Sequence, residues 1–224
     1  MISKEKQLQE LVQRYAEPTR QAMDNTAAKF ILGDGNPNAV IMIVGEAPGL
    51  NEDRQGKPFV GRSGKSLMDW LASIGLQRED VYISNIVKCH PMKNPKTPEA
   101  RGNDRPPKPH EIALCLPIML QEILIIRPRF LLTLGSPSTR TLLQTDETIT
   151  QLRGKAKPLA IEAIRKKIRE SGVHEDVPLS TQEINVLKDV QVLPTFHPAA
   201  LFHNPSLKEE VLKDLKTLQI LTRS

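Results

Sequence analysis

The feature that most constrains the fold of this chain is a recurring pattern: a short aliphatic, β-branched run, then a turn, then a stretch with helical spacing. The clearest runs are residues 39–44, 81–87, 130–134 and 190–193. Strands that alternate with helices form parallel sheets, because each helix crosses over the sheet and packs back on one of its faces. We therefore predict an α/β fold, a three-layer α/β/α sandwich around a central, mostly parallel, four-stranded sheet.

Three segments have the apolar spacing of helices that bury one face. The first begins behind Ser63, a residue type suited to an N-cap, and the others span residues 108–126 and 206–221. The apolar positions of the first and last of these helices are Leu67, Trp70, Leu71 and Ile74, and Leu207, Val211, Leu215 and Leu218.

The chain length of 224 residues suffices for one sizeable core, so we expect a single domain spanning residues 1–224 with two insertions. Residues 90–107 are rich in proline and poor in apolar residues, which predicts a loop. Residues 155–189 are polar, and residues 160–170 within them form a basic helix candidate. Its charges fit either a nucleic-acid contact or an ordinary solvated face. They are Arg165, Lys166, Lys167 and Arg169.

Charge and cysteine content narrow the class of protein. The net charge of +5 and the sequence pI of about 9.2 favour a polyanionic partner. The first 15 residues are charged and amphipathic rather than typical of a signal peptide, and no apolar run approaches the roughly 20 residues that span a bilayer. We therefore expect a cytoplasmic protein without a membrane partner, whose two cysteines are reduced thiols.

Polar residues follow three of the predicted strands. Glu46 follows the first strand, Asn85 ends the second, and His197 follows the last. Because open α/β sheets bind ligands beyond the carboxyl ends of their strands, we expect these side chains to meet at one mouth. The loop at residues 56–61 can add the aromatic ring of Phe59.

Three ordered motifs resemble those of a known family. They are GEAPGLNEDRQGKPFVGRSGK at residues 45–65, VYISNIVKCHP at 81–91 and PTFHPAALFHNP at 194–205, and the weaker signals GDGNPNA at 33–39 and LRG at 152–154 fall in the expected order. Together they resemble the type-four uracil-DNA glycosylases, known as iron–sulfur enzymes of bacteria and archaea. The resemblance implies a monofunctional DNA repair enzyme. It would flip uracil out of DNA and hydrolyse its N-glycosidic bond, leaving an abasic site.

The resemblance also implies a role for each residue of the site. Asn85 matches the family's uracil-reading asparagine, whose amide donates to O4 and accepts from N3–H. Phe59 matches the ring that stacks on the flipped base. His197 matches the donor to uracil O2, and Glu46 matches the carboxylate near the sugar and the incoming water. The backbone of Gly45 and Ala47 would close around the base, with Glu52 and Asp53 in support.

The loop that follows His197 is expected to enter or press on the DNA stack. It spans residues 199–204, with Leu201 or Phe202 as the wedge that replaces the flipped base. The implied partner is uracil-containing DNA, single- or double-stranded, and we expect the protein to act as a monomer.

The iron–sulfur cluster of the family is not expected here. Such a cluster needs four cysteine thiolates, and Cys89 and Cys115 match only the second pair. The first pair falls on Pro18 and Gln21, so we predict neither a cluster nor another metal. A bridging dimer, or His90 and His110 as substitute ligands, would be the ways to rescue a cluster. Without one, the N-terminal helix must dock through Leu8, Leu11, Val12 and Tyr15.

Other functions fit parts of the sequence. Each site residue alone has an ordinary explanation: a capping Glu46, a core Phe59, an Asn85 that satisfies a turn, a His197 that shapes a loop. Only their joint occurrence in family order favours a site. A dinucleotide-binding protein is disfavoured because GEAPG is not G-x-G-x-x-G, and its carboxylate would repel a phosphate. A DNA-binding protein that keeps the fold but has weak or no activity is the remaining alternative.

Overall fold

A mixed sheet forms the middle layer of the computed structural model, which describes residues 2–25, 28–97, 99, 102–172 and 179–223. Within these residues the sheet has six strands in the order β1-β3-β2-β4-β6-β5. The four inner strands are parallel, and β1 and β5 pair antiparallel at the two edges. The strands are β1 (Asp34–Gly35), β2 (Ile41–Gly45), β3 (Tyr82–Asn85), β4 (Phe130–Leu134), β5 (Lys157–Pro158) and β6 (Gln191–Thr195).

The prediction of a four-stranded sheet is therefore corrected to six strands. The four predicted strands are the four inner ones, and the two edge strands were missed. Each edge strand has only two residues, too few to show an alternating pattern. Gly35 and Pro158, which they contain, are also residue types that strand interiors disfavour.

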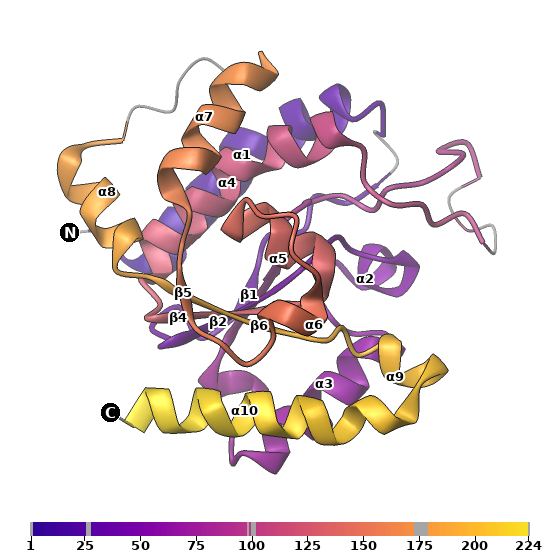
Figure 1. Ribbon diagram of the computed structural model, residues 1–224. Helices are drawn as coiled ribbons and strands as arrows, with labels where there is room; N and C mark the ends of the chain where they lie inside the picture. The colour runs from indigo at the N-terminus through magenta and orange to yellow at the C-terminus, as the bar shows by residue number, and fades with distance from the viewer. Residues whose placement is uncertain (1, 26–27, 98, 100–101, 173–178, 224) are drawn as a thin grey trace.

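Helices cover both faces of the sheet, which confirms the three-layer sandwich (Figure 1). One layer holds α1 (Lys4–Ala22), α4 (Pro109–Ile126), α7 (Ile161–Ser171) and α8 (Thr181–Lys188). The opposite layer holds α3 (Arg62–Ser73) and α10 (Lys208–Arg223). The shorter helices are α2 (Leu50–Gln55), α5 (Ser136–Leu143), α6 (Ile149–Leu152) and α9 (Ala200–His203), with 3-10 turns at Arg78–Asp80 and Pro205–Leu207.

Strand β2 shows how the sheet separates two apolar cores. Met42 and Val44 lie in the cluster under α4, whereas Ile41 and Ile43 lie in the cluster with Trp70 of α3. All five residues of β2 are buried, as expected of a parallel strand covered on both faces.

Helix α4 is the central helix of its layer. By length and composition it is apolar enough to cross a membrane, but most of it is buried inside the protein. Pro109 occupies its first turn, and the N–H of Lys108 donates to the Glu111 carboxylate at 2.7 Å. These contacts define the start of a core helix.

Helix α1 packs on α4, but the predicted contact stripe is wrong at one position. Leu8 and Leu11 face the protein, and Thr19 is buried two turns further on. Tyr15 is half-buried, whereas Val12 is exposed. Residues 8, 11, 15 and 19 share one side of a helix with 3.6 residues per turn, and Val12 lies at the edge of that side, where it is 37% exposed.

The two predicted insertions differ in structure. Residues 90–107 connect β3 to α4 as a loop that projects beside α2, with an antiparallel bridge between Met92 and Asp104 (Figure 1). The basic helix candidate is α7, and α8 is a further helix that was not predicted. Parts of both insertions, residues 98, 100–101 and 173–178, lie outside the described residues.

Candidate functional site

The site lies at the carboxyl ends of three parallel strands. Strand β2 ends at Gly45, and β3 ends at Asn85, which is the register partner of Gly45. Strand β6 ends two residues before His197. These strand ends lie at the end of the sheet that is nearest α2 and α9 (Figure 1). The sandwich therefore brings together polar groups that are far apart in the sequence.

A cavity of about 190 Å³ opens between these strand ends. It combines an aromatic ring, a carboxamide, an imidazole and a carboxylate, which is a suitable lining for a small planar polar ring. The lining residues are Ala47, Gly49, Glu52, Phe59, Ser63, Asn85 and His197.

Two fully buried charges anchor the strand end that carries Asn85. The Lys88 ammonium pairs with the Glu122 carboxylate and donates to the Asn85 carbonyl at 2.6 Å and to Ser84 Oγ at 2.9 Å. Glu122 also accepts from the Tyr82 hydroxyl at 3.2 Å. A buried charge needs such partners, and here they fix the backbone of Asn85.

The side chain of Asn85 has an unused acceptor. It is only 3% exposed, yet its Oδ1 has no hydrogen-bond partner among the residues that the structure describes. Buried polar atoms are nearly always paired, so this oxygen is an unsatisfied acceptor in a residue that lines the cavity. Gly45 permits the arrangement, because a Cβ at this position would lie 2.7 Å from the Phe59 ring and would overlap Asn85 Oδ1.

Phe59 is held in an unusual backbone conformation beside Asn85. Its φ of 53° is in the left-handed region, which costs energy for a bulky residue. Gly64 on α3 makes the conformation possible, because a Cβ there would collide with the Phe59 carbonyl. Arg78 secures the loop by donating to the Pro58 carbonyl at 2.8 Å while it pairs with Asp34.

Glu52 joins two loops of the site. Its carboxylate accepts the backbone N–H groups of Val60 at 3.0 Å, Gly61 at 2.8 Å and Gly49 at 3.3 Å. Asp53, grouped with it in the sequence analysis, lies away from the cavity lining and accepts from the N–H of Lys29 at 2.7 Å.

The contacts and burial of His197 favour a neutral imidazole that can donate a hydrogen bond. Its Nδ1 accepts from the N–H of Ala199 at 3.2 Å, so the neutral ring carries its proton on Nε2. Burial lowers the pKa of His197, against the opposing effect of the Glu52 charge, and thereby favours the neutral ring. The ring centroid lies 6.1 Å from that of Phe59.

Glu46 lies in a second hollow next to the first. This hollow has a volume of about 280 Å³, and His197 borders both cavities. Its other lining includes Gly135 and Ser136 at the start of α5 and Phe196. Burial raises the pKa of Glu46, which moves the carboxyl toward the range of a proton acceptor near neutral pH.

The predicted wedge residues lie on α9. Leu201 packs partly against the core beneath the helix. The Phe202 ring is covered by the Arg62 guanidinium, whose central carbon lies 3.8 Å from the ring centroid. Because α9 begins three residues after His197, the wedge candidates and the imidazole share one segment.

Sequence reasoning missed two residues of the cavity. Gly49 received no role, and Ser63 was predicted to be the N-cap of a helix. That assignment is wrong: Gly61 is the N-cap and α3 begins at Arg62, so Ser63 lies in the first turn and lines the cavity. The GEAPG motif was the available signal for Gly49, since the motif places it after the strand end.

The two cysteines are packed as apolar residues. Cys89 and Cys115 are both fully buried in one apolar cluster with Met23 and Ala28. Burial raises the pKa of both thiols, that of Cys115 to about 11. In this structure both sulfurs therefore pack as neutral, apolar groups.

The described residues do not fit a four-iron cluster. They contain no group of three or more His, Cys, Asp or Glu side chains placed to hold a metal ion. Pro18 and Gln21 lie on the exposed side of α1. His90 is buried and contacts the Asp104 carboxylate, and His110 is exposed at the start of α4.

Comparison with known families covers most of the chain. A family model described as "Uracil DNA glycosylase superfamily" matches residues 32–216. The chain belongs to this superfamily. The matched range contains every residue that lines the two cavities.

Several similar proteins are named type-4 uracil-DNA glycosylases. That of Sulfurisphaera tokodaii is 37% identical over 194 residues, which is 84% of this chain and 73% of the relative. That of Archaeoglobus fulgidus is 32% identical over 215 residues, 94% of this chain and 91% of the relative. That of Thermotoga maritima is 32% identical over 219 residues, 96% of this chain and 95% of the relative. The resemblance to the type-four family is thereby confirmed.

Proposed function

We propose that this protein is a monofunctional uracil-DNA glycosylase that flips uracil from DNA and hydrolyses its N-glycosidic bond, leaving an abasic site for base excision repair. The observation that carries the proposal is Asn85, which lines a cavity beside an aromatic ring and whose buried Oδ1 has no hydrogen-bond partner among the described residues. The names of the type-4 relatives support the same activity. We further propose that it works in the cytoplasm as a monomer on single- or double-stranded DNA.

Recognition of uracil rests on the amide of Asn85. Its Oδ1 accepts from uracil N3–H, and its Nδ2 donates to O4. Cytosine presents an acceptor at N3 and a donor at C4, so both contacts become repulsive. Phe59 stacks on the base, and the backbone near Gly45 and Ala47 closes the cavity around it. This division of roles is supported by the lining of the cavity.

Bond cleavage rests on His197 and Glu46. As the bond between sugar C1′ and uracil N1 breaks, its electron pair moves onto uracil and the sugar becomes cation-like. His197 Nε2–H donates to the negative charge that develops on O2. The Glu46 carboxylate stabilises the sugar cation and accepts the proton of the water that adds to C1′. The neutral ring of His197 and the neighbouring position of Glu46 support these roles.

The first test exchanges the base-reading amide for a carboxylate. Asn85→Asp keeps the acceptor for N3–H but loses the donor to O4, so uracil excision should fall by about 10- to 100-fold. Asn185→Asp on the exposed surface of α8 makes the same chemical change away from the site and should leave the rate unchanged. Single-turnover excision from a uracil oligonucleotide measures both. Unchanged excision by folded Asn85→Asp would remove Asn85 from the proposed role.

The second test concerns the wedge. Extrusion of a stacked base costs a few kcal/mol, and less stacking is lost in a single strand. Leu201→Ala and Phe202→Ala should therefore slow excision from duplex DNA more than from single strands. Ile220→Ala, an exposed position on α10, serves as the control. Equal losses on both substrates would show that neither side chain acts as a wedge.

We also propose that the protein functions without the family's iron–sulfur cluster. The support is the packing of both cysteines among apolar side chains, the positions of Pro18 and Gln21 on the exposed side of α1, and the absence of a four-ligand group in the described part of the chain. Anaerobically purified protein should be colourless, with iron far below one equivalent per chain, and Cys115→Ser should retain excision. Four irons per chain, with a broad absorbance near 400 nm, would contradict the proposal.

A further inference from the structure

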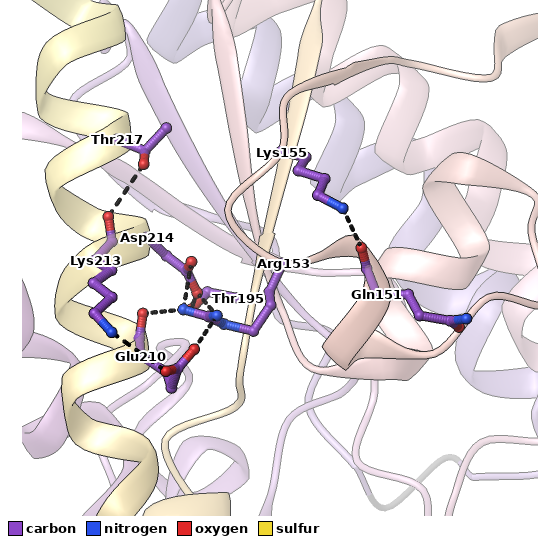
Figure 2. Close-up of polar contacts among 8 residues, drawn as sticks. All are labelled: Gln151, Arg153, Lys155, Thr195, Glu210, Lys213, Asp214 and Thr217. Carbon is purple, nitrogen blue, oxygen red and sulfur yellow. Dashed lines mark hydrogen bonds and ion pairs between the residues drawn. The ribbon is translucent and has the colours of Figure 1, made fainter.

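The segment between β6 and α10 carries both His197 and α9, and its two ends meet at one arginine. Thr195 closes β6 just before this segment, and α10 begins at Lys208 just after it. Arg153, in the turn after α6, lies between these two ends (Figure 2). The residues that interact with Arg153 there are not among those that line the cavity with Asn85.

Arg153 holds α10 through two carboxylates. Its Nε and Nη2 donate to the two oxygens of Asp214 at 3.0 and 2.8 Å, an arrangement typical of a bidentate pair. Its Nη1 pairs with the Glu210 carboxylate, and its Nη2 also donates to the Glu210 carbonyl. Figure 2 shows these contacts converging on one guanidinium.

Asp214 connects Arg153 to β6. Its Oδ2 accepts from Thr195 Oγ1 at 2.7 Å, and the two residues are 2% and 0% exposed. The backbone adds a second link, because the N–H of Gly154 donates to the Pro194 carbonyl at 2.9 Å. Gly154 has a φ of 71°, and a Cβ there would lie 2.5 Å from Asp214.

We infer that Arg153, Thr195, Glu210 and Asp214, here called the Arg153 cluster, position His197 and α9 for base excision. The inference rests on the proposed function. Within its own segment His197 is held by the N–H of Ala199, a bond that cannot fix the segment relative to Asn85 on β3. The Arg153 cluster links the two elements that flank that segment, β6 and α10. Arg153 also lies 5.5 Å from the ring of Phe196, the neighbour of His197.

The decisive variant is Thr195→Val, which keeps the shape of the side chain and removes only the hydroxyl that reaches Asp214. Its single-turnover excision rate on single-stranded uracil DNA should fall at least about tenfold, with little change in KM. Thr195→Ser should restore the rate. Thr217→Val is the matched control, because among the described residues its hydroxyl donates to the Lys213 carbonyl of its own helix and not to Asp214 (Figure 2).

A readout that does not depend on activity separates this inference from the proposed function. The Cε1–H resonance of His197, assigned with His197→Gln, should move in Thr195→Val and stay in place in Thr217→Val. Rates are compared well below the Tm of each variant, so that lost stability alone changes nothing. If excision by the wild type is detected and neither rate nor resonance changes in Thr195→Val, the positioning role is wrong while the proposed function stands. If the wild type does not excise uracil, the resonance alone decides the role of the Arg153 cluster.

Discussion

The buried pair of Lys88 and Glu122 is the interaction on which the strand end that carries Asn85 depends. Neither side chain has any exposed surface, and isolated charges in such a place would be costly. Each is satisfied by several partners, among them the carbonyl of Asn85 and the hydroxyl of Ser84. The pair thereby joins α4 to the end of β3 and fixes the backbone from which Asn85 enters the cavity. Removal of either charge would leave the other unpaired directly beneath the site.

The other strand ends are fixed by the same type of contact. The Arg153 cluster uses buried carboxylate contacts to hold the end of β6, and Glu52 uses its carboxylate to hold the loop that carries Phe59. Apolar packing on both faces sets the sheet, but it is not directional. Hydrogen-bonded charges are directional, and they fix the orientations that the proposed roles of Asn85 and His197 require.

The sequence predicted the inner architecture because periodicity reports burial. Short, largely apolar β-branched runs marked the four inner strands, and the parallel arrangement that follows from them placed Glu46, Asn85 and His197 at one edge. The two-residue edge strands left no such trace. Val12 lies at the edge of the buried side of α1, where helical spacing alone does not decide exposure. Ser63 was misassigned because a capping residue and a cavity residue look alike in sequence. The hydrogen-bond networks of Lys88 and Arg153 could not be predicted from the sequence for a different reason. A buried charge is recognised only when its partner, far away in the chain, is known.

The central claim is that this fold carries out base excision and does not merely bind DNA. The most direct measurement incubates the wild-type protein with a single-stranded oligonucleotide that contains one uracil, followed by alkali to cleave abasic sites. The account predicts release of free uracil and strand cleavage at the uracil position, with no cleavage of the matching cytosine oligonucleotide. Retardation of the uracil oligonucleotide without any cleavage would contradict the account and identify a DNA-binding protein that keeps only the fold.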